Sequence, residues 1–333
     1  MTGHQRYTAM LRGEAVDFVP RIPILMQFAA NYIGAKYGAF CSDYRVKVEG
    51  NVRCAEDFGL DLVGVMSDPY SETQGFGADI VFLDEGIPRC PHPPLAATTD
   101  LARLPRPDPL RAERMSAAVR AVGEYRRRCG DLYDILGWVE GPAAEAADLR
   151  GVSQFLLDLM DDPSWCGALM DLCVDVAIDF ARAQVDAGAH TIGIGDAIAS
   201  QVTPGLYEEW ILPRERRLVA AIRDMGAHVR LHICGNITHL LDGIAELRVD
   251  VLDVDHMVDL GLVRRKVGPR VALAGNMDPV ACVLHGTPAS IRDRLRRDYE
   301  VVGSPFLINA GCEIPPGTPY ENLHALCQPL APE

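Results

Sequence analysis

The chain has 333 residues, of which 48% are hydrophobic and 23% are charged, a balance typical of a globular protein with a sizeable core. Its formal net charge of −14 disfavours nucleic acid or an anionic membrane as the main partner, because both require clustered Lys and Arg. The ten cysteines lack regular spacing, and no stretch is typical of a signal peptide or a membrane span, so we expect reduced thiols and a cytoplasmic protein.

Apolar runs of strand length alternate with longer amphipathic stretches, which is the pattern of a parallel α/β fold. Eight expected strands joined by right-handed helical crossovers predict a (β/α)8 TIM barrel with a short N-terminal helical extension, as a single domain over residues 1–333. The Pro-rich segment 88–109 is expected to be an extended surface connection. The expected strands are 21–26, 60–66, 132–138, 191–195, 229–234, 251–254, 271–274 and 306–310, and the expected helices are 43–58, 113–129, 163–187, 207–225 and 288–299.

Three residues, His232, Cys234 and Cys312, offer one nitrogen and two sulfur donors, the set of a zinc site that keeps a fourth position open. His232 and Cys234 are two residues apart in the expected strand 229–234, so both side chains point the same way. With nine His and ten Cys, such a pair also arises readily by chance, and Cys is often a small buried hydrophobe. In a barrel, however, the C-terminal strand ends meet at one mouth, where these three residues converge.

The C-terminal residues 309–322, NAGCEIPPGTPYEN, resemble the closing motif of the uroporphyrinogen decarboxylase superfamily. Residues 275–279, GNMDP, look like the motif that precedes it, and residues 196–200, DAIAS, look like its mid-chain acidic turn. The resemblance extends from about residue 6 to residue 326. It implies a (β/α)8 barrel.

Two branches of that superfamily differ at the residues singled out above. Uroporphyrinogen decarboxylases carry an Arg-rich segment after the first strand, whereas this chain has MQFAANY at 26–32, so an octacarboxylate would lose its charge-assisted contacts. Decarboxylases also have His in place of Cys312 and lack the His-x-Cys pair. The other branch is similar to methylcobamide:coenzyme M methyltransferases, whose zinc motif His232, Cys234 and Cys312 match residue by residue.

The second branch implies an enzyme that moves a methyl group between a methylcobamide and a thiol such as coenzyme M. A zinc-bound thiol is deprotonated at neutral pH and is therefore a nucleophile. The chain has no D-x-H-x-x-G motif for cobalamin, so the corrinoid is expected on a small partner protein. The alternatives are the reverse direction, which takes methyl from a methoxy, methylamine or methylthio substrate onto Co(I), uroporphyrinogen decarboxylation, and a zinc-stabilised scaffold.

Four further polar residues follow expected strands and are candidates for the site. Asp255 and Asp196 are candidate catalytic residues: Asp255 either holds the resting zinc as a fourth ligand or caps a helix. Asp196 either orients His232 or caps a helix that begins near residue 204. Asn276 and Asp278 are candidate cofactor-binding residues, expected to shape the mouth rather than to react.

Overall fold

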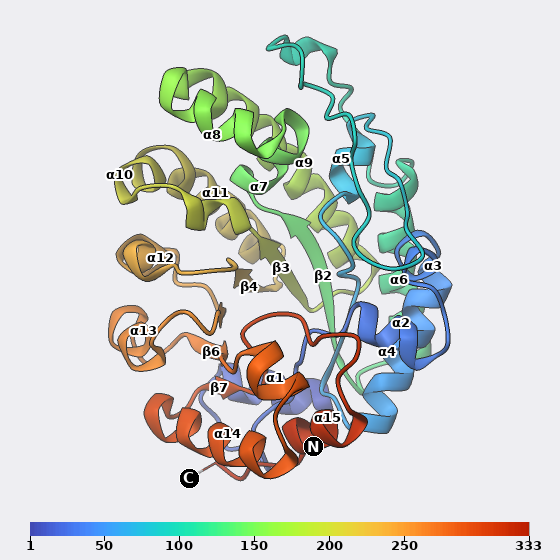
Figure 1. The fold of residues 1–333 in the computed structure, drawn as a ribbon, viewed down its shortest axis with the longest axis vertical. Helices are drawn as coiled ribbons and strands as arrows, with labels where there is room; N and C mark the ends of the chain where they lie inside the picture. Colours follow the sequence, from blue (N-terminus) through green and yellow to red (C-terminus); the bar gives the residue numbers. More distant parts are fainter. Residues whose placement is uncertain (333) are drawn as a thin grey trace.

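The computed structural model describes residues 1–332. Seven parallel strands form one curled sheet in which each strand pairs with the next along the chain, from β1 to β7. Helices surround the strands, and both chain ends lie at the same end of the molecule (Figure 1). The strands are β1 (Leu62–Gly64), β2 (Asp134–Glu140), β3 (Thr191–Gly195), β4 (His228–His232), β5 (Val251–Val254), β6 (Ala272–Gly275) and β7 (Phe306–Leu307).

The longer helices begin and end at residues that satisfy their free backbone groups. Asp162 accepts from the Trp165 N–H at the start of α9, a helix of 25 residues that begins with Pro163. Gly188 then ends α9 in the left-handed conformation. The helices are α1 (Gly3–Leu11), α2 (Gln27–Tyr32), α3 (Tyr37–Ser42), α4 (Tyr44–Phe58), α5 (Ser71–Gly75), α6 (Glu113–Cys129), α7 (Pro142–Arg150), α8 (Val152–Asp161), α9 (Pro163–Ala187), α10 (Pro204–Leu206), α11 (Leu212–Asp224), α12 (Leu241–Leu247), α13 (Leu260–Val267), α14 (Pro288–Val302) and α15 (Tyr320–Cys327).

The sheet is covered on its outer side by these helices and filled by side chains on its inner side. Every residue of β2, β3, β5 and β6 is buried. Strands buried on both faces are typical of parallel sheets with helical crossovers. Within the described residues, no helix has the length and apolar character needed to cross a bilayer.

The expected first strand, 21–26, is not a strand. Only Arg21 makes a parallel bridge, to Ile308, and the chain enters α2 at Gln27. The Ile22 N–H donates to the Ile308 carbonyl (2.8 Å), and the Arg21 carbonyl accepts from the Asp61 N–H (2.9 Å), so the segment lies between β7 and the start of β1. Prolines at 20 and 23 lack the N–H that a regular ladder needs.

The predicted N-terminal helical extension is present as α1, which packs at the N-terminal end of the sheet. The Arg6 guanidinium contacts the buried Asp61 carboxylate, which also pairs with Arg21 at 3.0 Å. The His4 N–H donates to the Leu132 carbonyl before β2 (3.3 Å). These contacts tie α1 to the N-terminal ends of the strands, opposite the end at which the candidate ligands lie.

Other expected elements are confirmed or shifted. The helices at 113–129 and 163–187 have the predicted bounds, as α6 and α9. The expected helix 207–225 begins with a π-helical turn, Tyr207–Ile211, before α11. β4 ends at His232, so Cys234 lies in the following loop rather than on the strand, and β7 is shorter than the expected 306–310. The segment 88–109 is irregular except for an isolated antiparallel bridge of Arg89 to Val81 and the 3-10 turn Leu101–Arg103.

Candidate metal centre

The three predicted ligands converge at the C-terminal ends of β4 and β7. The His232 Nε2 atom lies 3.0 Å from the Cys234 Sγ atom and 3.8 Å from the Cys312 Sγ atom, and the two sulfurs are 3.8 Å apart. A tetrahedral zinc ion with bonds of about 2.3 Å to sulfur and about 2.0 Å to nitrogen has edges of about 3.8 Å between sulfurs and about 3.5 Å between sulfur and nitrogen. The sulfur–sulfur edge matches this geometry, the edge from His232 to Cys312 is slightly longer, and the edge from His232 to Cys234 is about 0.5 Å shorter, so a small movement of the Cys234 loop would let all three atoms reach one zinc ion.

The protons of the metal-free group also indicate a cation site. The Cys234 thiol donates to Cys312 and lowers the pKa of Cys312 to about 4, against the effect of burial, while the pKa of Cys234 itself is raised. Burial alone would lower the pKa of His232, but Asp253 and Cys312 raise it to about 10. The site thus holds a thiolate beside an imidazolium, and a metal ion can take the place of the acidic protons.

The imidazole of His232 is oriented by Asp253, one strand away. The Nδ1 atom of His232 lies 3.1 Å from the Asp253 carboxylate, which also accepts from Arg230 at 2.8 and 2.9 Å. Burial alone would raise the pKa of Asp253, but the Arg230 guanidinium and His232 lower it to about 2. An ionised carboxylate at Nδ1 keeps a proton on that nitrogen, so Nε2 faces the sulfurs and can bind a metal ion once it loses its own proton.

Asp196, which the sequence made a candidate for orienting His232, contacts a different element. It is fully buried, and its carboxylate accepts from the N–H groups of Ala143 (3.4 Å) and Ala144 (2.7 Å), at the start of α7. The short helix near residue 204 is instead capped by Thr203. Asp196 therefore caps α7, and the carboxylate that orients His232 is that of Asp253.

Asp255 lies beside the ligands but outside the group of donor atoms that converge. Its carboxylate accepts from the N–H of Gly235 (2.9 Å) and from the N–H of Met257 (3.1 Å). It also lies 2.9 Å from the His256 imidazole. Because Gly235 directly follows Cys234, Asp255 fixes the loop that carries this ligand.

Asn276 and Asp278 also form hydrogen bonds with backbone groups of the loops around the candidate site. The buried Asn276 side chain donates to the carbonyls of Asp255 (3.2 Å) and Val258 (2.6 Å). Asp278 accepts from the Val280 and Ala281 N–H groups and is half-buried, 3.6 Å from the His256 ring. Asn276 therefore holds the chain after β5, and Asp278 begins the π-helical turn Pro279–Leu284.

A second group of potential ligands, His4, Asp134 and His190, lies at the opposite end of the strands. The Nδ1 atom of His190 accepts a hydrogen bond from the Ile135 N–H (3.1 Å), which occupies its lone pair. The two imidazole rings stack at 4.0 Å between centroids. This group is therefore a hydrogen-bonded structural cluster, in contrast to the three donors at the other end.

Two residues that the sequence reasoning missed, Trp138 and Glu140, border the metal centre. The Trp138 ring centroid lies 6.3 Å from that of His232, and its Nε1–H donates to the Glu140 carboxyl at 2.9 Å. A Cβ atom at Gly193 or Gly195 would lie 2.2 or 2.7 Å from the indole, so only glycine leaves room for it. The sequence pattern that indicates these two residues is Trp-x-Glu at the end of β2, followed by Gly-x-Gly at the end of β3.

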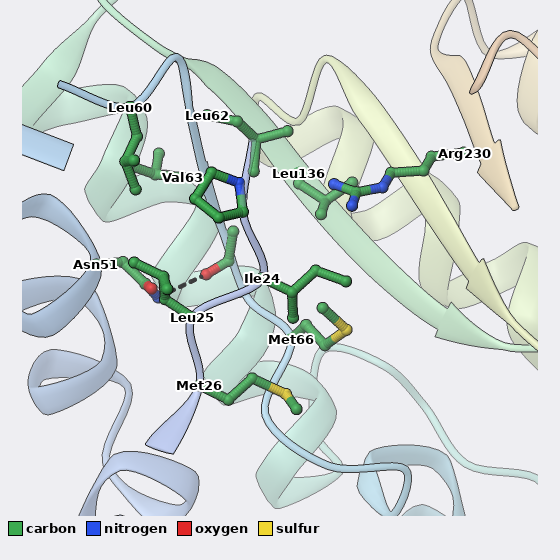
Figure 2. Close-up of a pocket in the computed structure, with 12 residues that line it drawn as sticks. Ile24, Leu25, Met26, Asn51, Leu60, Leu62, Val63, Met66, Leu136 and Arg230 are labelled. Carbon is green, nitrogen blue, oxygen red and sulfur yellow. Dashed lines mark hydrogen bonds between the residues drawn. The ribbon is translucent and has the colours of Figure 1, made fainter. Parts of the chain in front are cut away.

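The interior beneath the centre is closely filled. A cavity of about 30 Å³, room for about one water molecule, lies between β1, β2 and the N-terminal segment. Figure 2 shows its apolar lining, including Ile24, Met26 and Leu136, with Arg230 reaching toward Leu136. Because Asp253 already pairs with Arg230, this space offers no free charge. The candidate ligands therefore lie above a filled interior, at the C-terminal ends of the strands.

Comparison with known proteins identifies the family and agrees with the fold. A methylcobamide:CoM methyltransferase of Methanosarcina mazei is 28% identical over 98% of this chain and 97% of its own. A uroporphyrinogen decarboxylase of Gloeobacter violaceus is 30% identical over 91% of each chain. The solved structure of a methyltransferase from Methanosarcina mazei superposes with a TM-score of 0.89 at 25% identity, covering 98% of this chain and 97% of that one. The family pattern described as Uroporphyrinogen decarboxylase (URO-D) matches residues 2–330, and the chain belongs to this family.

Proposed function

We propose that this protein is a zinc-dependent corrinoid methyltransferase, which moves a methyl group between a methylcobamide on a partner corrinoid protein and a small thiol, the class to which coenzyme M belongs. The observation that carries the proposal is the convergence of His232, Cys234 and Cys312, whose donor atoms lie 3.0 to 3.8 Å apart, close to the spacing around one zinc ion. Overall sequence identity does not favour either activity, because the methyltransferase relative is 28% identical and the decarboxylase relative is 30% identical. The ligand residues do, because decarboxylases of the family lack this set.

The chain's own residues prepare the site in three ways. Asp253 holds the His232 ring with Nε2 free, and Asp255 holds the loop of Cys234 through Gly235. Two cysteinates and a neutral imidazole balance the charge of a divalent cation. Zinc bound here would lower the pKa of a thiol at the open fourth position, so that its sulfur is a nucleophile at neutral pH.

The proposal includes the architecture around the site. We propose that the chain is a single domain over residues 1–333, acting in the cytoplasm, and that it is an eight-fold barrel in which residues 20–24 take the eighth position between β7 and β1. The backbone hydrogen bonds of Pro20 and Ile22 to Ile308 support this closure. A closed cylinder would fix the distance between the ends of β4 and β7, which carry the ligands.

Metal analysis tests the centre. The purified protein should hold about one zinc ion per chain, and the His232→Ala, Cys234→Ser and Cys312→Ser variants should lose it. Each variant should remain folded by circular dichroism, because a core of this size does not need a metal to fold. The control is Cys282→Ser, which removes a partly buried thiol outside the group. Full zinc retention in all three ligand variants would refute the site.

Activity is tested with methylcobalamin and small thiols. The expected result is a spectral change from methyl-Co(III) to Co(I), absent in Cys312→Ser. Incubation of Co(I) cobalamin with methoxyaromatics and methylamines tests the reverse direction, which the same centre would support by polarising the leaving heteroatom. Uroporphyrinogen should not be decarboxylated, since residues 26–32 contain no cation for its carboxylates. Formation of coproporphyrinogen at enzymatic rates would contradict the branch assignment.

A further inference from the structure

Glu140 and the zinc ligand His232 stand in one row of the sheet. The register pairs Glu140 with Gly195 on β3, and Gly195 with His232 on β4. Glu140 and His232 are therefore two strands apart, about 10 Å between Cα atoms at ordinary strand spacing. Because Gly195 has no side chain, β3 itself contributes no side chain between them, and the Trp138 indole takes the space over Gly195 instead.

Trp138 fixes the direction of the Glu140 carboxyl group. The Trp138 backbone exchanges hydrogen bonds of 2.9 Å with the side chain of Gln184, and its indole lies over Gly193 and Gly195. The indole Nε1–H donates to Oε1 of Glu140. The other oxygen, Oε2, lies 3.3 Å from the position that a Cβ atom of Gly195 would take, so it lies over β3, on the side of His232.

That second oxygen is free, although Glu140 is only 8% exposed. Oε2 accepts no hydrogen bond from the described part of the chain, whereas Oε1 accepts the bond from Trp138. This mostly buried carboxyl group therefore keeps one oxygen available to a group from outside the chain. This oxygen lies across Gly195 from His232, in the same row of the sheet.

The charges around Glu140 select a cationic donor. Burial, together with the carboxyl groups of Glu72, Asp148 and Asp196, raises the pKa of Glu140 well above its usual range, so without a partner the group favours its protonated form, and a cation bound beside it would take the place of that proton. Arg230 lies on β4, two residues before His232, and its charge is balanced by its two hydrogen bonds to Asp253. An anionic substrate group would find no counter-charge here, whereas an ammonium group would gain a carboxylate partner beside an aromatic ring.

We propose that Glu140, positioned by Trp138, binds the ammonium group of the methyl-accepting substrate, which is therefore a short amino-thiol rather than a sulfonate- or carboxylate-bearing thiol. This inference rests on the proposed methyl transfer to a thiol and names the substrate class of that site. Glu140 is the residue that determines specificity in this proposal, and Trp138 is a positioning residue.

Three thiols with the same two-carbon chain test the charge preference: 2-aminoethanethiol, 2-mercaptoethanol and 2-mercaptoethanesulfonate. For each thiol, calorimetric affinity and the rate of methylcobalamin demethylation are measured with the zinc-loaded protein. The amino-thiol should bind about tenfold or more tightly than the neutral thiol, the size of one charge-assisted hydrogen bond, and the sulfonate should bind most weakly. Equal affinities for the three thiols, or tightest binding of the sulfonate, would overturn the inference.

Substitutions distinguish direct binding of the ammonium group by Glu140 from the electrostatic effect of the other nearby carboxyl groups. Glu140→Gln should lower the preference for the amino-thiol over 2-mercaptoethanol by about tenfold while zinc content stays full, and Trp138→Phe should lower it partly. The ratio between two thiols in one protein, compared across variants, cancels their intrinsic differences. The control is Glu145→Gln, which removes a neighbouring buried acid that accepts from Thr73 instead. An unchanged ratio in Glu140→Gln, or an equal loss in Glu145→Gln, would refute the role of Glu140.

Different results would refute methyl transfer to a thiol and the preference for an amino-thiol. If no thiol binds the zinc-loaded protein or demethylates methylcobalamin, the proposed function is wrong and the inference falls with it. If all three thiols react without a charge preference, the proposed function stands and the inference alone is wrong.

Discussion

Substitution of Asp253 by Asn should weaken both zinc binding and the fold. The Asp253 carboxylate accepts from Arg230 at 2.8 and 2.9 Å and from His232 at 3.1 Å, and both Asp253 and Arg230 are 1% exposed. An amide has one acceptor oxygen, so it cannot serve all three donors. A buried Arg230 without its counter-charge should lower the free energy of unfolding by about 3–5 kcal/mol. Loss of the Nδ1 partner should lower zinc affinity about 10- to 100-fold.

Zinc affinity is measured by competition with a chromogenic chelator, and stability by urea unfolding of the metal-free protein, which separates the two effects. The matched control is Asp250→Asn, at the start of the same strand region. Asp250 is half-buried and accepts from the Val229 N–H at 2.8 Å, so this variant should lose about 1 kcal/mol and keep its zinc affinity. Zinc affinity of Asp253→Asn equal to that of the native protein would refute the orienting role of Asp253.

Two further predictions concern the surroundings of the centre. Gly193→Ala should lower the free energy of unfolding by about 1–3 kcal/mol, because its Cβ atom would lie 2.2 Å from the Trp138 ring. The control is Gly123→Ala in α6, which has no atom within 4 Å of the added Cβ and should raise the free energy of unfolding by about 0.5–1 kcal/mol. Thermal unfolding of both variants measures these changes. Burial raises the pKa of Glu72 to about 7, so its contribution to stability is present below the unfolded pKa of about 4.3 and is lost as pH rises through the folded value. The free energy of unfolding of Glu72→Gln, relative to that of the native protein, should therefore rise as pH increases from about 4.3 to about 7. Urea unfolding of both proteins at pH 4 and at pH 8 measures this difference, and an equal difference at the two pH values would contradict the prediction.

Much of the local structure follows from the sequence alone. The bounds of α6 and α9 are set by residues within the helices and at their ends, such as Asp162, Pro163 and Gly188, so local chemistry is sufficient to predict them. The alternation of apolar runs with amphipathic stretches likewise indicates parallel strands with helical crossovers. The donor types of His232, Cys234 and Cys312 limit the possible metal to one that accepts nitrogen and sulfur.

Contacts between strands were decided only by the tertiary structure. Whether Asp196, Asp253 or Asp255 meets His232 depends on which carboxylate the register places beside it, and no local pattern fixes that register. The buried Arg230 selects Asp253, because a buried cation requires a charged partner on an adjacent strand. Glu140 and His232 similarly come to lie in one row, on either side of Gly195, only through the pairing of β2, β3 and β4. Sequence determines which side chains can do the chemistry, and strand pairing over long separations in the chain determines which of them meet.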